Sequence, residues 1–146
     1  MIRAEKLFSK EQQQEIVAAI QQSELQTSGE IRLFIENKCK DDVLDRAAFI
    51  FEKLEMHKTD LRNGVLFYLA IDHRKFAILG DAGINAVVKK DFWDEIKTEM
   101  LKHFTTGDFT KGLKSGITMA GEALKKHFPH ERSDKNELSD DIVFGK

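Results

Sequence analysis

The residues best suited to chemistry are oxygen-bearing side chains in three glycine-containing loops. Glu30, Asn63 and Asp81 each stand directly beside a glycine. Glycine lets the backbone approach a ligand or another loop closely, and carboxylate and amide oxygens suit hard cations such as Ca²⁺ or Mg²⁺. Asp60 and Asp108 lie in loops that could reach the same place, so we count all five as candidate metal ligands.

These loops can meet only if the intervening segments build a suitable sheet. Residues 65–71 form an unbroken apolar run, which predicts a central strand that is buried on both faces. After a four-residue polar link, residues 76–79 resume the run and predict an antiparallel hairpin. Residues 30–36 alternate in polarity, which predicts an edge or half-covered strand because the second face is partly polar.

Helices are expected between and after these strands. Ser9 and Gln12 fit a capping box that opens the first helix. Asp41 or Asp42 should cap a second helix, whose apolar residues recur at spacings of three and four up to Leu54. Further helical segments are predicted at residues 84–88, 91–104 and 109–128.

The order of these elements predicts an α/β fold: a three-layer α/β/α sandwich around a small mixed β-sheet. A strand–helix–strand unit makes the first two strands parallel, and the hairpin strand returns antiparallel. The starts of the first two strands and the end of the third should then lie on one rim, with the three glycine loops. We expect one domain over residues 1–128 and a polar, poorly ordered tail over 129–146, in which residues 142–144 could dock on the body.

The candidate residues have simpler interpretations as well. Asp81 can cap the following helix, and the glycines can serve only to turn the chain. The opposite end of the sheet also competes as a site, because α/β proteins usually bind ligands beyond the carboxyl ends of parallel strands. Glu36, Asp72 and His73 lie there, although the last two are more simply hairpin residues.

Composition narrows the classes of function. The 146 residues carry a net charge of −2 with no basic block, so a nucleic-acid partner is not expected. Cys39 is the single cysteine, which suits a reducing compartment. The start of the sequence lacks the apolar region of a signal peptide, and no run is long enough to insert in a membrane, so we expect a cytoplasmic protein. Phosphate-binding glycine motifs, the G-x-S-x-G elbow and the H-E-x-x-H zinc motif are absent.

Several segments, in this order, resemble the TPM domain. They are RNGVLFYLAIDHRKFAILGDAGI from Arg62, the turn FTTGDF from Phe104, and KGL from Lys111. That family takes its name from a thylakoid-lumen phosphatase-like protein, a photosystem II protein and a modulator of acetylcholine receptors. The resemblance spans about residues 9–128 and implies an α/β/α sandwich with a divalent-cation site in its loops, and weak acid phosphatase activity in some plant members.

The chain departs from the family pattern at two places. Arg62 stands where many members carry an acid, and Asp81 where many carry an aromatic residue between glycines. Many relatives are exported or anchored in a membrane, whereas this sequence reads as a free-standing cytoplasmic version.

Three functions follow as hypotheses. The first is a non-catalytic TPM-like module that binds Ca²⁺ or Mg²⁺ and serves in protein maintenance or assembly. The second is a weak metal-dependent acid phosphatase, for which the sequence offers acids and Arg62 but no identifiable nucleophile. The third is a structural adaptor without metal, with the terminal NELSDDIVFGK segment as the docking site for a protein partner.

Overall fold

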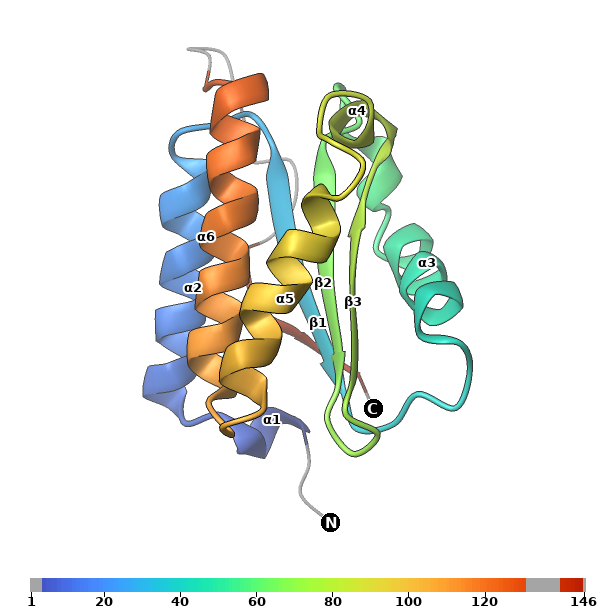
Figure 1. Cartoon of the computed structure of the whole chain (residues 1–146), viewed down its shortest axis with the longest axis vertical. Coiled ribbons are helices and arrows are strands. Elements are labelled where there is room, and N and C mark those ends of the chain that lie inside the picture. The colour runs from blue at the N-terminus through green and yellow to red at the C-terminus, as the bar shows by residue number, and fades with distance from the viewer. Residues whose placement is uncertain (1–3, 131–139, 146) are drawn as a thin grey trace.

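One mixed four-stranded sheet forms the middle layer of the molecule (Figure 1). The structure is a computed structural model that describes residues 4–130 and 140–145. The sheet order is β3-β2-β1-β4, in which β1 pairs in parallel with both β2 and β4, and β2 pairs antiparallel with β3. The strands are β1 (Glu30–Glu36), β2 (Gly64–Ala70), β3 (Lys75–Gly80) and β4 (Val143–Phe144).

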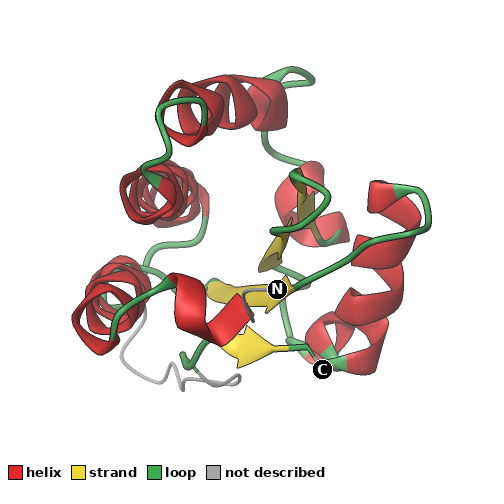
Figure 2. Ribbon diagram, turned by 90° about the horizontal axis from the view of Figure 1, so that it is seen from below, coloured by secondary structure: helices red, strands yellow, loops and turns green. Residues whose placement is uncertain are grey.

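Helices cover both faces of the sheet, which confirms the α/β/α sandwich (Figure 2). One layer contains α2 (Lys10–Glu24), α5 (Phe92–Phe104) and α6 (Phe109–His127). The other layer contains α3 (Val43–Lys53), followed by the short 3₁₀ helix η1 (Met56–Lys58). Two single-turn helices, α1 (Ala4–Leu7) and α4 (Ala82–Asn85), lie at the ends of the sheet.

β2 is the central element that its apolar run predicts. All seven of its residues are buried. Because side chains alternate across a strand, β2 contributes to both hydrophobic cores: Val65, Phe67 and Leu69 belong to the core under α2, α5 and α6, and Leu66, Tyr68 and Ala70 to the core under α3.

The interpretation of residues 30–36 as an edge or half-covered strand is wrong. β1 lies inside the sheet, because β4 pairs with its free side through Phe34↔Val143 and Ile35↔Phe144. The backbone N–H of Gly145 extends this ladder with a hydrogen bond to the Ile35 carbonyl at 2.7 Å. The expected docking of residues 142–144 is thus confirmed, and within the terminal segment offered as a docking site for a partner, residues 143–145 pair with β1 of their own chain. The expectation of a poorly ordered tail concerns mainly residues 131–139, which lie outside the described residues.

Local signals in the sequence place most helix starts correctly. Ser9 and Gln12 form the reciprocal capping box at the start of α2. Asp42 caps α3 by accepting hydrogen bonds from the backbone N–H groups of Leu44 and Asp45. Asp91 occupies the N-cap position of α5, but its side chain makes no capping hydrogen bond. Over the described residues, no helix combines the length and apolar character needed to cross a membrane.

Candidate functional site

The three glycine loops meet at one rim of the sheet, as the topology predicts. Glu30 pairs with Gly64 in the β1–β2 register, and Val65 pairs with Gly80 in the β2–β3 register. The loops are also joined directly, because the N–H of Gly83 donates to the Arg62 carbonyl at 2.8 Å. The rim therefore gathers segments that are far apart in the sequence.

Asp81 is engaged by protein groups on this rim. Its carboxylate accepts two hydrogen bonds from the Arg62 guanidinium, Nε to Oδ2 at 2.7 Å and Nη2 to Oδ1 at 2.8 Å. Oδ1 also accepts the Ala82 N–H at 2.7 Å, so Asp81 caps α4. The ion pair raises the pKa of Arg62. A cation bound by Asp81 would have to compete with Arg62 and with the Ala82 N–H for the carboxylate oxygens.

Asp108 does not reach the rim, and the expectation that its loop could do so is corrected. Its side chain caps the start of α6 by accepting the Lys111 N–H at 3.1 Å. The opposite end of α6 is the one beside the rim, where Leu124 packs against Gly29. A 19-residue helix is about 28 Å long, because each residue adds about 1.5 Å. Asp60 is exposed in the loop that leads to Asn63.

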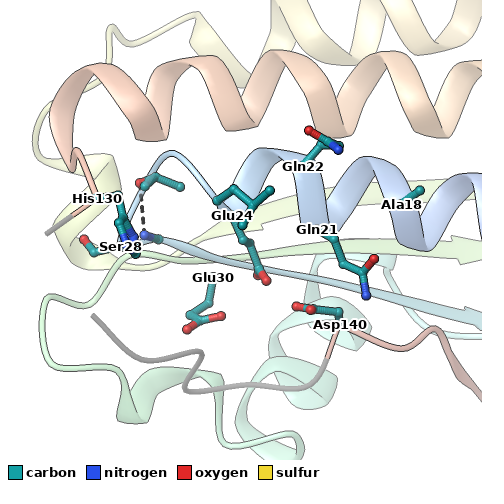
Figure 3. A pocket seen from close by; sticks show the side chains of 11 residues that line it. Ala18, Gln21, Gln22, Glu24, Ser28, Glu30, His130 and Asp140 are labelled. Carbon is teal, nitrogen blue, oxygen red and sulfur yellow. Dashed lines mark hydrogen bonds between the residues drawn. The ribbon is translucent and has the colours of Figure 1, made fainter. Parts of the chain in front are cut away.

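Glu30 faces a cavity of about 460 Å³ at the β1 end of the rim. Glu24, at the end of α2, and Asp140, just before β4, line the same cavity. Figure 3 shows the carboxylates of these three residues on the same side of β1. Glu30 is only 2% exposed, so its carboxylate lies among protein atoms rather than in water.

The environment of Glu24 strongly favours its neutral form. Burial raises its pKa well above the ordinary value, and a hydrogen bond with Asp140 and the negative charges of Glu30 and Asp140 raise it further. The backbone N–H of Ile31 donates to Glu24 Oε2 at 2.8 Å and acts in the opposite direction. A positively charged group bound among these carboxylates would compensate for the burial of Glu24 and would reduce its repulsion by Glu30 and Asp140.

Arg32 adds one positive charge beside the acidic residues. Burial lowers its pKa, and the negative charges of Asp141, Asp140 and Glu24 act against that lowering. Arg32 thus neutralises part of the negative charge at this edge of the sheet.

Asn63 contributes a buried acceptor that none of the described residues satisfies. Its side chain is buried, its Nδ2 donates to the Ser28 hydroxyl at 3.3 Å, and its backbone N–H donates to Thr59 Oγ1 at 3.2 Å. Its Oδ1 is buried without a hydrogen bond within the described residues. Leaving such an acceptor unsatisfied costs on the order of 1–3 kcal/mol. Because Ser28 lines the cavity, Asn63 lies directly behind the cavity wall.

The oxygen atoms around this cavity are of the chemical type that binds divalent cations, but they are not already arranged as a metal site. Carboxylate and amide oxygens are hard ligands of the type that Ca²⁺ and Mg²⁺ take. Across residues 4–130 and 140–145, however, no three His, Cys, Asp or Glu side chains stand close enough together to hold a metal ion. A cation would have to draw the carboxylates of this cavity inward.

The sequence did not identify Glu24 or Asp140 as candidate ligands, because neither belongs to a recognisable motif. One signal was available for Glu24. A carboxylate in the last turn of a helix opposes the helix dipole, and α2 has no basic residue in its last turn. Asp140 offered no comparable signal, since it lies in a polar segment whose position depends on β4.

At the opposite end of the sheet, the alternative site suggested by the sequence, the polar groups of Glu36, Asp72 and His73 make hydrogen bonds or close polar contacts with other protein groups. Burial alone would raise the pKa of Glu36, but hydrogen bonds from Arg46 and from the Tyr68 hydroxyl hold it below the ordinary value. His73 Nδ1 contacts the backbone carbonyl of Cys39 at 2.7 Å. Asp72 donates its backbone N–H to the Asn37 carbonyl at 2.8 Å. These contacts agree with the interpretation of Asp72 and His73 as hairpin residues.

Comparisons with known proteins agree with this architecture. The TPM domain family matches residues 1–123. The solution structure of the BA42 protein from the psychrophilic bacterium Bizionia argentinensis superposes with a TM-score of 0.89 at 44% identity, covering 94% of this chain and 95% of that one. A search of curated proteins found no match.

Two more distant solved structures share the fold. The N-terminal domain of a protein from P. gingivalis aligns with a TM-score of 0.68 at 18% identity, over 86% of this chain and 83% of that one. The N-terminal domain of the cg2496 protein from Corynebacterium glutamicum aligns with a TM-score of 0.61 at 14% identity, over 93% and 80%. With the match over residues 1–123 and the 44% identity to BA42, the chain belongs to the TPM domain family.

Proposed function

We propose that this protein is a TPM domain that binds a divalent cation, Ca²⁺ or Mg²⁺, and has no catalytic activity of its own. The observation that carries the proposal is the gathering of Glu24, Glu30 and Asp140 around one cavity, with the unsatisfied Oδ1 of Asn63 behind its wall. A dication would offset the negative charges of Glu30 and Asp140, which raise the pKa of Glu24. A role in protein maintenance or assembly and a cytoplasmic location stay predictions from the sequence.

Cation and proton should compete at this site. Ligation needs ionised carboxylates, whereas burial and like charges keep Glu24 protonated. Cation binding should therefore release a proton and tighten as the pH rises. This pH dependence separates a specific site from loose attraction to surface acids, whose protonation hardly changes between pH 6 and 8.

The phosphatase alternative has less support. A metal-assisted hydrolase needs a cation to hold the phosphate and a positioned water. Arg62, the basic residue of the rim that could hold phosphate, has its guanidinium paired with both oxygens of Asp81. Turnover of a phosphomonoester that is abolished by Asp81→Ala would favour this alternative over ours.

A titration with Ca²⁺ and Mg²⁺, followed by amide NMR and thermal unfolding, tests the proposal. A ligand that binds only the folded state raises the melting temperature. We expect that rise in the wild type, with amide shifts near Glu24, Glu30, Asn63 and Asp140. Glu30→Gln should weaken the apparent affinity for the cation at least tenfold. The rise in melting temperature and the amide shifts should then need a correspondingly higher cation concentration.

Glu122→Gln is the matched control, because it removes an exposed carboxylate from α6 outside the cavity. It should bind the cation like the wild type. If millimolar Ca²⁺ and Mg²⁺ leave the melting temperature and the amide spectrum of the wild type unchanged, the cation proposal is wrong, and the metal-free adaptor becomes the better interpretation.

A further inference from the structure

A second cavity, of about 310 Å³, lies at the other end of the molecule. It is lined by residues of the β2–β3 hairpin and of the end of α5 and its turn into α6, and both segments lie at the lower end of the molecule in Figure 1. Its volume is at the lower end of the range for small-molecule sites. It also lies toward the carboxyl end of β2, where Leu69 forms part of its lining, and α/β proteins commonly bind ligands beyond such strand ends.

Aromatic rings form its walls. Phe76 and Phe104 meet edge to face with ring centroids 5.1 Å apart, and Phe104 and Phe109 lie 5.2 Å apart. Gly112 permits this arrangement, because a Cβ there would lie 2.4 Å from Cε1 of Phe104. The absence of a side chain at position 112 therefore leaves room for the ring of Phe104 beside α6. Such walls accept the edge or face of another flat apolar group.

Arg74 is the single ionisable side chain among the described residues that line this cavity. It is the last residue of the turn between β2 and β3, with φ +52°, a left-handed conformation that glycine or asparagine adopts more readily. Arg62 is also left-handed, but its guanidinium is paired with Asp81. The Arg74 guanidinium makes no hydrogen bond or ion pair with the described part of the chain, so its charge is available at the mouth of the cavity.

We propose that this cavity binds a small carboxylate with an apolar, preferably aromatic, body. The body packs against the exposed surfaces of the Phe76, Phe104 and Phe109 rings that line the cavity, and the carboxylate forms a charge-assisted pair with the guanidinium of Arg74. A free organic acid and the carboxyl-terminal phenylalanine of a peptide share this chemistry. The inference is independent of cation binding, because the two cavities have no lining residue in common.

Amide NMR titration with 3-phenylpropionate tests the proposal on the full chain. We expect shifts confined to residues 74–76 and 101–109. The uncharged analogue 3-phenylpropan-1-ol should bind about tenfold more weakly or worse, because it loses a hydrogen-bonded charge pair. Acetyl-Gly-Phe and its terminal amide form a second pair of probes: tighter binding of this peptide acid than of 3-phenylpropionate identifies a chain terminus as the source, and tighter binding of 3-phenylpropionate identifies a free acid.

Arg74→Asn supplies the decisive variant, since asparagine tolerates the left-handed conformation and should preserve the hairpin. It should lose binding of the acid about tenfold or more while its thermal unfolding stays like that of the wild type. Lys126→Gln, at the far end of α6, controls for general surface charge and should bind normally. The proposal is overturned if millimolar 3-phenylpropionate shifts no amides in this region, if the alcohol binds as tightly as the acid, or if Arg74→Asn binds like the wild type.

Discussion

Arg62 and Asp81 clamp the loop before β2 to the loop after β3 through two parallel hydrogen bonds of 2.7 and 2.8 Å. The Asp81 side chain is 6% exposed, whereas that of Arg62 is 51% exposed. The carboxylate is thus the buried member of the pair. It also caps α4, so the two residues contribute unequally to the stability of the rim.

Asp81→Ala should therefore destabilise the protein more than Arg62→Gly. The alanine removes both the ion pair and a helix cap, and loss of a cap alone costs about 1 kcal/mol, or roughly 2–4 °C in melting temperature for a chain of this size. Arg62→Gly loses the pair but relieves the left-handed backbone at φ +52°. Thermal unfolding of both variants measures the difference, and equal melting temperatures would contradict it.

Stability should fall as the pH rises above the ordinary titration range of carboxyl groups, because of Glu24. Its pKa is raised in the folded state by burial, by Asp140 and by Glu30. Below about pH 4 both states hold the proton. Above it the unfolded state releases the proton first, so folding is opposed progressively as the pH rises toward the folded pKa.

Glu24→Gln tests this linkage. The amide cannot ionise, so the decline in the free energy of unfolding between pH 5 and 9 should become shallower than in the wild type, as measured by urea unfolding at several pH values. Glu30, Asp140 and Arg32 are unchanged in this variant. The pH dependence of its free energy of unfolding therefore shows what all groups other than Glu24 contribute. A wild-type curve that is flat or rising over this range, with an unchanged curve for Glu24→Gln, would show that Glu24 is ionised in the folded protein.

Glu36 should produce the opposite behaviour in acid. Its pKa is lowered in the folded state, since hydrogen bonds from Arg46 and Tyr68 outweigh the effect of burial. Its contribution to stability is present above the ordinary carboxyl pKa and is lost as the pH falls through the folded value. Glu36 thus limits stability on the acid side, whereas Glu24 limits it on the alkaline side.

Tyr68→Phe isolates one part of that network. It removes the hydroxyl that donates to Glu36 and keeps the ring that stacks on Phe34 at a centroid distance of 6.0 Å. We expect a loss of about 1–3 kcal/mol at pH 7 and an acid-unfolding midpoint at a higher pH than in the wild type. Urea unfolding and acid titration by circular dichroism measure these effects, and an unchanged acid midpoint would argue against the role of Tyr68.

Gly83 should tolerate no side chain, because the crossing of two loops leaves it no room. A Cβ at this position would lie 2.0 Å from the backbone oxygen of Leu61 and 2.7 Å from that of Arg62. Backbone oxygens cannot rotate away as side chains can, so Gly83→Ala should cost about 3 kcal/mol or more. Gly107→Ala is the comparison: it meets open space at φ +84° and should cost about 1–2 kcal/mol from backbone strain alone. Denaturant unfolding that ranks the two variants in reverse would contradict this account.

The local elements of this fold could be predicted because their causes are local. The capping box of Ser9 and Gln12 lies within one turn of helix. The apolar run at residues 65–71 predicts a doubly buried strand, and β2 is that strand to within one residue at each end. Parallel pairing of β1 and β2 follows from chain connectivity, so the meeting of the glycine loops on one rim could also be predicted.

The edge of the sheet could not be predicted, because it depends on a segment distant in the sequence. β1 reads as an edge or half-covered strand from its own residues, but Val143 and Phe144 pair with its free side. The polar residue Glu36 on its second face is accommodated by Arg46 from α3 and by Tyr68 from β2. Those partners are invisible in the alternation of polarity along one strand.

The sequence by itself determined the main helices, the three strands β1 to β3, the sandwich and the rim on which Glu30, Asn63 and Asp81 lie. Only the tertiary structure decided which charged groups face one another there. Asp81 is paired with Arg62, Asp108 lies at the far end of α6, and Glu24 and Asp140 join Glu30 around a cavity. The physical reason is range: helix caps and strand periodicity act over a few residues, whereas the pairing of buried charges depends on where packing brings distant segments together.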